Sequence, residues 1–296
     1  MGNSMNNKSQ FLIRFIFLTC MLSLPNISLS KVNNEKHSGL YISGQYKPSV
    51  SVFSNFSVKE TNFHTKHLIA LKQDVDSVEI DTGSNTAGIS NPSNFTIPYT
   101  AEFQDNHTNC NGSIGYAFAE GPRIEIELSY EKFDVKNPTG YTTVKDAYRY
   151  FALAREINIS LFQPKQKEGS GIYHVVMKND GLSILSNIVN ICYDFSLNNL
   201  PISPYLCGGM GINAIEFFDA LHVKFAYQSK AGISYQLLRK INLFIDVYYY
   251  EVISNKFKNL KVQHVHELKD NPKVTSAVAT LDIAYFGSEA GIRIIF

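Results

Sequence analysis

Apolar and polar residues alternate with a period of two along several segments of this 296-residue chain. From residue 124 to 131, Ile, Leu and Tyr occupy the even positions, while three glutamates and a serine occupy the odd positions. On a β-strand, this alternation separates an apolar face from a charged face. The same pattern recurs in residues 223–235 and 241–250. The chain is therefore expected to fold mainly into two-sided strands.

Weaker forms of the pattern bring the number of candidate strands to eight. The additional segments are 40–46, 112–119, 184–195, 205–213 and 284–296. The intervals between strands are alternately long and short, as in outer-membrane barrels, where periplasmic turns are short and external loops are long. The spacing predicts an all-β fold, a transmembrane up-and-down antiparallel β-barrel of eight strands. Its external loops are expected near 51–110, 135–182, 214–222 and 253–283.

Two other architectures share the alternating pattern. A soluble sandwich or lipocalin-like barrel also has strands of period two. A larger barrel of ten strands results if 62–71 and 148–157 are counted as strands, and one of up to twelve if other loops also contribute. Eight strands are favoured because 148–157 has apolar residues at both odd and even positions. The long loops otherwise read as polar.

The last residues of the chain favour a membrane barrel over a soluble fold. The chain ends in a terminal aromatic residue, and apolar residues precede it at every second position. In a membrane barrel, such an aromatic residue fits the girdle at the lipid interface. Glu289, Gly291, Ile294 and Phe296 also fit the terminal signal that is read by the barrel-assembly machinery. That machinery and outer-membrane lipid are therefore expected partners.

The first thirty residues have the features of a secretory signal peptide. Lys8 and Arg14 precede an apolar stretch, and Ser28 and Ser30 provide small residues for cleavage. We therefore expect residues 1–30 to be removed and residues 31–296 to form the barrel in the bacterial outer membrane. With 27 basic and 26 acidic residues, the chain lacks the excess of positive charge that nucleic-acid binding requires.

Three cysteines follow the expected signal peptide. Folding 184–195 against 204–213 places Cys192 opposite Cys207, with both side chains on the inner face. Because an exported protein meets an oxidising compartment, a cross-strand disulfide is one hypothesis and two buried thiols are the other. Cys110 has no obvious partner and either links subunits or remains a thiol. The sequence does not assign an oligomeric state.

Charged residues recur at positions that face the barrel interior. Their mixed signs predict ion pairs inside the barrel. In an eight-stranded barrel, such side chains fill the interior, whereas a larger barrel uses them to line a water-filled channel. The expected interior charges are Glu125, Glu127, Glu131, Lys224, Lys230, Asp246 and Arg293.

No motif of a hydrolase, nucleotide-binding loop or zinc protease occurs after the expected signal peptide. The histidines at 64, 67, 264 and 266 lack the accompanying carboxylates or cysteines of a dedicated metal site. We therefore expect no enzymatic activity, metal or cofactor.

Six segments, spread over the whole exported part of the chain, resemble one known family. The segments 38–48, 151–156, 179–183, 215–220, 256–260 and 282–287 are similar to the major surface antigens of Ehrlichia and Anaplasma. The resemblance implies an immunodominant outer-membrane barrel, and some family members are described as porins. Residues 78–106 and 134–146 fall where such proteins vary, and their Asn, Ser, Thr and Gly content is typical of solvated loops.

The expected function is therefore that of an outer-membrane surface antigen. Its barrel serves as an anchor, and its variable loops are presented to a host antibody or surface receptor. The alternative is a porin for passive diffusion of small hydrophilic solutes.

Overall fold

The computed structural model describes most of the chain after residue 37. Residues 38–61, 65–79, 88–155, 175–197, 200–262 and 276–296 are described in full, and 157–158, 163–164, 166–167, 170–172, 174 and 264–265 by their backbone. The expected signal peptide and the histidines at 64 and 266 lie outside the described residues, so cleavage after residue 30 stays a prediction.

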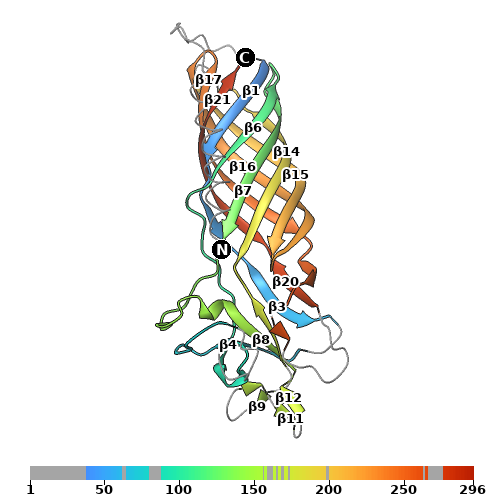
Figure 1. Ribbon diagram of the computed structural model, residues 1–296. Helices are drawn as coiled ribbons and strands as arrows, with labels where there is room; N and C mark the ends of the chain where they lie inside the picture. The colour runs from blue at the N-terminus through green and yellow to red at the C-terminus, as the bar shows by residue number, and fades with distance from the viewer. Residues whose placement is uncertain are drawn as a thin grey trace.

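Eight antiparallel strands form a closed barrel (Figure 1). They are β1 (Gly39–Tyr46), β6 (Cys110–Ala117), β7 (Pro122–Phe133), β14 (Leu182–Asp194), β15 (Ile202–Phe217), β16 (Ala220–Leu238), β17 (Ile241–Ile253) and β21 (Ala284–Ile295). Neighbouring strands pair in this order, and β1 pairs with β21 to close the barrel. Each strand coincides with a segment predicted from the sequence, so the eight-stranded fold is confirmed.

The outer surface of the barrel is apolar, whereas the interior holds the buried charged and amide side chains together with apolar ones such as Ile184 and Ile188. On β7, Ile126 and Leu128 are 53% and 56% exposed, whereas Glu127 between them is 1% exposed. The same arrangement holds on the other strands, where the outward side chains are mainly Ile, Leu, Val, Tyr and Phe. A continuous apolar outer surface fits lipid, not water, because soluble proteins rarely expose large apolar patches. The soluble sandwich considered above is therefore excluded.

The two ends of the barrel differ. At the short-turn end, residues 118–121, 195–201 and 239–240 connect successive strands, and the chain terminates there (Figure 1). The opposite end, which we call the long-loop end, carries the other connections. The prediction of a long loop at 214–222 is wrong, because β15 and β16 continue to a two-residue turn at Phe218 and Asp219. Both have positive φ angles, 51° and 54°, which fit the tight hairpin turn that follows the strand twist.

The remaining long connections fold into a β domain at the long-loop end (Figure 1). We call the described residues of 53–109, 134–181 and 254–283 the cap domain. It contains a five-stranded sheet in the order β19-β13-β8-β4-β5, a three-stranded sheet in the order β18-β20-β3, and two strand pairs, β9 with β10 and β11 with β12. The short strand β2 (Ser49–Ser51) continues from β1 and pairs with β21.

The elements of the cap domain have the following bounds. They are β3 (Ser54–Glu60), β4 (His67–Leu71), η1 (Pro92–Asn94), β5 (Phe95–Pro98), η2 (Ala147–Arg149), β8 (Tyr150–Ala154), β9 (Ile157–Asn158), β10 (Gln163–Pro164), β11 (Gln166–Lys167), β12 (Ser170–Ile172), β13 (His174–Lys178), β18 (Lys256–Leu260), β19 (His264–Val265) and β20 (Ala277–Asp282). In the described part of the chain, no helix is long and apolar enough to cross a membrane.

The cap domain has an apolar core, which corrects the expectation that the long loops are polar throughout. Its fully buried side chains include Ile69 on β4, Phe95 on β5, and Phe151 and Leu153 on β8. Strand β8 is buried on both faces, which explains its apolar residues at odd and even positions. It pairs with β4 and β13 in the cap domain. The larger barrel, in which 62–71 and 148–157 cross the membrane, is therefore wrong.

Candidate functional site

A ring of four charged side chains crosses the barrel interior. Lys47, one residue after β1, lies 2.7 Å from Glu127 and 3.0 Å from Glu289. Lys230 on β16 contacts the same two carboxylates at 2.5 and 3.0 Å. All four side chains are almost fully buried. Two cations and two anions therefore neutralise one another where burial of a lone charge would be costly.

Amide side chains complete the surroundings of the ring. Glu127 accepts hydrogen bonds from Asn111 Nδ2 at 2.7 Å, Gln228 Nε2 at 2.8 Å and Asn190 Nδ2 at 3.1 Å. The donors come from β6, β16 and β14, so the carboxylate joins side chains from opposite sides of the barrel. Between the ring and the short-turn end, an internal void measures only ≈10 Å³, about the volume needed for one water molecule. The middle of the barrel is thus filled.

At the long-loop end, Glu131 binds the segment 106–109, which continues β6 along the barrel wall beside β1 and β2. Its carboxylate accepts from Ser49 Oγ at 3.1 Å, from Asn106 Nδ2 at 2.7 Å, and from Asn109 Nδ2. The backbone of Asn106 also exchanges two hydrogen bonds with Ser49, and Lys47 N donates to Asn109 O. The segment 106–109 is therefore tied to the barrel wall from several sides.

A second charged cluster lies toward the short-turn end. Arg123 on β7 donates from Nε to Asp194 at 2.8 Å and from Nη1 to Glu125 at 3.2 Å. Tyr41 Oη donates to the same Glu125 oxygen at 2.7 Å. Arg123 thus has carboxylate partners on two strands.

The structure contains a disulfide between Cys192 and Cys207, which face each other on β14 and β15. Both side chains are buried in the barrel interior. The Sγ atom of Cys207 lies 3.9 Å from Nη2 of Arg123. Cys110, the first residue of β6, is a free and exposed thiol. The structure therefore brings together two of the three cysteines considered in the sequence.

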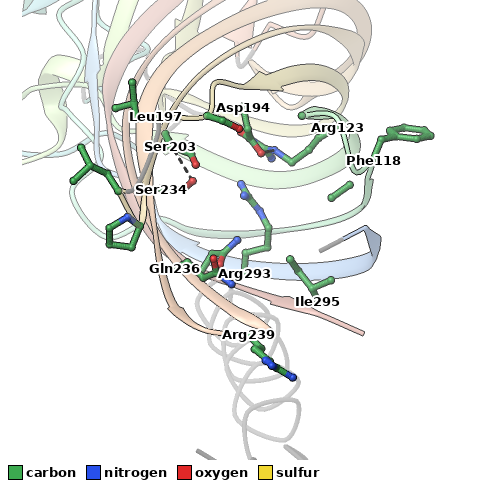
Figure 2. A pocket seen from close by; sticks show the side chains of 16 residues that line it. Phe118, Arg123, Asp194, Leu197, Ser203, Ser234, Gln236, Arg239, Arg293 and Ile295 are labelled. Carbon is green, nitrogen blue, oxygen red and sulfur yellow. Dashed lines mark hydrogen bonds and ion pairs between the residues drawn. The ribbon is translucent and has the colours of Figure 1, made fainter. Parts of the chain in front are cut away.

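A cavity of ≈570 Å³ opens among the short turns. Figure 2 shows Arg293 reaching from the wall into this space, toward the paired Arg123 and Asp194. Gln236, Asn242 and three serines add polar groups to the lining. In contrast to the middle of the barrel, this end contains space for a small molecule.

Six of the seven expected interior charges are buried inside the barrel, and Lys224 is placed elsewhere. Lys224 lies near the tip of the β15–β16 hairpin, where Nζ donates to Ser254 Oγ at 3.2 Å and to Lys256 O at 2.6 Å. The remaining acid, Asp246, accepts a hydrogen bond from Tyr205 Oη in the interior. Lys224 therefore joins the barrel to the cap domain and contributes nothing to the ring.

The residues of the expected assembly signal have different surroundings. Phe296 is 61% exposed at the short-turn end. Glu289 belongs to the buried ring. Gly291 faces inward, where an added Cβ would lie 2.6 Å from Gly44 O and 2.6 Å from Cζ of Phe244. Close packing therefore explains a glycine at position 291 without any recognition by the barrel-assembly machinery. The role of these four residues in assembly stays a prediction.

Sequence reasoning missed two members of the ring as interior charges. Lys47 follows Tyr41, Ser43 and Gln45 at every second position, so its place on the inner face was available from the alternation. Glu289 has the same parity as Arg293 but was considered only as part of the terminal signal. Among the described residues, no group of three or more His, Cys, Asp or Glu side chains could hold a metal ion.

The sequence of the chain matches a family of known proteins. Residues 32–296 match the model of a family described as surface antigen. Over 258 residues, the chain is 26% identical to major surface antigen 4 of Anaplasma marginale, covering 86% of this chain and 83% of that protein.

Similar solved structures include outer-membrane proteins. The outer membrane protein OprG from Pseudomonas aeruginosa has a TM-score of 0.46 and 14% identity, covering 89% of this chain and 100% of that one. Neisserial surface protein A has a TM-score of 0.40 and 11% identity, covering 88% and 100%. Because the family model spans every barrel strand and the cap domain, the chain belongs to the surface antigen family, the outer-membrane family that its sequence segments resemble.

Proposed function

We propose that the barrel anchors the cap domain in the outer membrane and that the cap domain is the part presented to the host. The observation that carries this proposal is the buried apolar core of the cap domain, which is continuous with the adjoining end of the barrel and gives the long connections a defined shape. In the proposed topology, the short turns face the periplasm, as is usual for bacterial barrels. A host antibody or surface receptor is the partner.

Buried polar contacts support a defined shape for the cap domain. Arg155 donates from Nε and Nη2 to the two carboxylate oxygens of Glu60 at 2.9 and 3.0 Å, and both side chains are buried. Tyr99 stacks on Phe151 at 4.2 Å between ring centroids and accepts a hydrogen bond from Asn179 at 3.1 Å. Burial raises the pKa of Tyr99 above its usual value, so its hydroxyl stays neutral. Antibodies would therefore meet a conformational surface.

The filled interior supports an anchoring role over the porin alternative. The ring of Lys47, Glu127, Lys230 and Glu289 crosses the barrel interior, and the void beside it measures only ≈10 Å³. An eight-stranded barrel is just wide enough for side chains to fill its interior. The proposal therefore assigns the barrel neither solute diffusion nor catalysis.

Epitope tags at opposite ends of the barrel test this proposal. One tag is inserted at residues 137–140, which are exposed in the cap domain, and a matched tag at 119–120, which are exposed in a short turn. On intact cells, antibody should bind the first tag and reach the second only after permeabilisation. Binding to the second tag alone on intact cells would invert the topology and overturn the proposal.

A further inference from the structure

The cavity at the short-turn end has the size and position of a ligand site. Its ≈570 Å³ falls within the range of small-molecule sites, about 300–1,000 Å³. Its lining residues come from the three short turns and from the adjoining ends of the strands. No role in anchoring or presenting the cap domain requires this space.

Arg293 is a buried cation without an ion-pair partner among the described residues. The residue is 3% exposed, and its Nε is buried without a hydrogen bond. In the described part of the chain, its guanidinium makes no ion pair and contacts the rings of Tyr41 and Phe244, at 5.0 and 5.2 Å from their centroids. Stacking of this kind orients a guanidinium but leaves its N–H donors free. Glu125 and Asp246 also line the small void beside Arg293, but among the described residues neither makes an ion pair with it. A buried guanidinium without a bonded counter-ion is costly, so a partner of opposite charge is expected.

The charges around the cavity are unbalanced in the same direction. Three arginines line it, Arg123, Arg239 and Arg293, against a single lining carboxylate, that of Asp194. Arg123 already pairs with Asp194 at 2.8 Å. Arg239 is exposed on the β16–β17 turn at the rim (Figure 2). The cavity therefore has an excess of positive charge. One of the unpaired guanidinium groups, that of Arg293, is buried, and the other, that of Arg239, is accessible at the rim.

The residues around Arg293 allow an aromatic ring and an amide to lie close to its guanidinium. Gly291 lies two residues before Arg293 on the same face, and a Cβ there would lie 2.6 Å from Cζ of Phe244. The glycine therefore makes room for the ring that stacks on the guanidinium. Asn242 is directly opposite Arg293 on β17 and also lines the cavity. Its amide offers a further hydrogen-bond donor close to the guanidinium.

We propose that this cavity binds a small anion with a phosphate or carboxylate group, and that Arg293 is its principal ligand. The planar guanidinium fork matches both groups and binds them through two parallel hydrogen bonds. Arg239 at the rim attracts the anion, and Asn242 and Gln236 supply neutral donors. In the proposed topology, the site faces the periplasm. The anion is either a soluble molecule of that compartment or the head group of an anionic phospholipid.

Thermal unfolding of residues 31–296, refolded in zwitterionic micelles, tests the proposal. Pyrophosphate should raise the melting temperature above that in sodium chloride of equal ionic strength, because a ligand of the folded state stabilises it. A second arm replaces pyrophosphate with phosphatidylglycerol in mixed micelles, which distinguishes the head group from the soluble anion. Arg293→Gln should weaken pyrophosphate binding in calorimetry by about tenfold or more, the usual loss for a charged hydrogen bond. Lys240→Gln, on the same turn as Arg239 but outside the cavity lining, is the matched control and should bind normally.

Asn242→Asp gives a second test that does not depend on Arg293→Gln folding. It places a carboxylate opposite Arg293, so it should raise the melting temperature without ligand and abolish the effect of pyrophosphate. Stabilisation of the unchanged protein by either probe, lost in both variants, supports the site. The proposal is overturned if neither probe stabilises the unchanged protein. It is equally overturned if Asn242→Asp binds pyrophosphate as strongly as the unchanged protein.

Discussion

The charged ring in the barrel interior makes a quantitative prediction about stability. Lys230 contacts both Glu127 and Glu289, at 2.5 and 3.0 Å. Lys230→Met leaves these two buried carboxylates with Lys47 as their shared cation. Removing one partner of a buried ion pair costs about 3–5 kcal/mol, because the other charge remains buried. We expect a loss of this size in the free energy of unfolding.

A second substitution separates charge balance from lost packing. In the double variant Lys230→Met with Glu127→Gln, one cation and one carboxylate remain, Lys47 and Glu289, at 3.0 Å. The free energy of unfolding of the double variant should be closer to that of the unchanged protein than the free energy of unfolding of the single variant is. The coupling free energy between the two substitutions should reach about 2 kcal/mol.

Equilibrium unfolding of the refolded protein in micelles measures both quantities. The chain has 17 Tyr and no Trp, so tyrosine fluorescence and circular dichroism are the signals. Lys132→Met is the matched control, since Lys132 forms a surface pair with Asp134 at 3.2 Å. Its loss should not exceed about 1 kcal/mol. A loss below about 1 kcal/mol for Lys230→Met, with additive effects in the double variant, would mean that water screens the ring and would refute a filled interior.

Four further predictions follow from the same structure. In planar bilayers, the refolded protein should show no porin-like conductance steps, because side chains fill the barrel; regular steps would favour the porin alternative. Phe296→Asp should reduce assembly in cells far more than Phe118→Asp, an exposed aromatic at the same end, while both refold equally in micelles; equal assembly in cells would show that Phe296 is only a strand end. Arg155→Ala leaves Glu60 buried without its bidentate partner and should destabilise the cap domain by about 3–5 kcal/mol, measured as faster proteolysis of the cap domain while the barrel stays intact. A maleimide should label Cys110 in the folded, unreduced protein and reach the other cysteines only after reduction and unfolding.

The barrel strands were predictable because lipid and the polar interior impose opposite requirements on successive residues. On β7 and β17, the period-two pattern therefore runs through the whole strand. The cap domain was not predictable in the same way. Strand β8 is covered on both faces, so its apolar run has no period and resembles a break in the barrel pattern. Asn, Ser and Gly in the surrounding turns made these connections read as loops throughout.

The interior charges show what alternation can and cannot predict. Parity assigns a side chain to the inner face, but it does not give the height of that side chain along the barrel axis. Lys224 and Lys230 have the same parity, yet six residues of β-strand separate them by about 20 Å. Lys230 therefore lies in the ring, whereas Lys224 lies at the long-loop end of the barrel and contacts Lys256 of the cap domain. Height depends on the stagger between neighbouring strands, which the closure of β1 against β21 determines for the barrel as a whole. Ion pairs inside a barrel thus require the register of all eight strands, while the inner face of one strand requires only its own sequence.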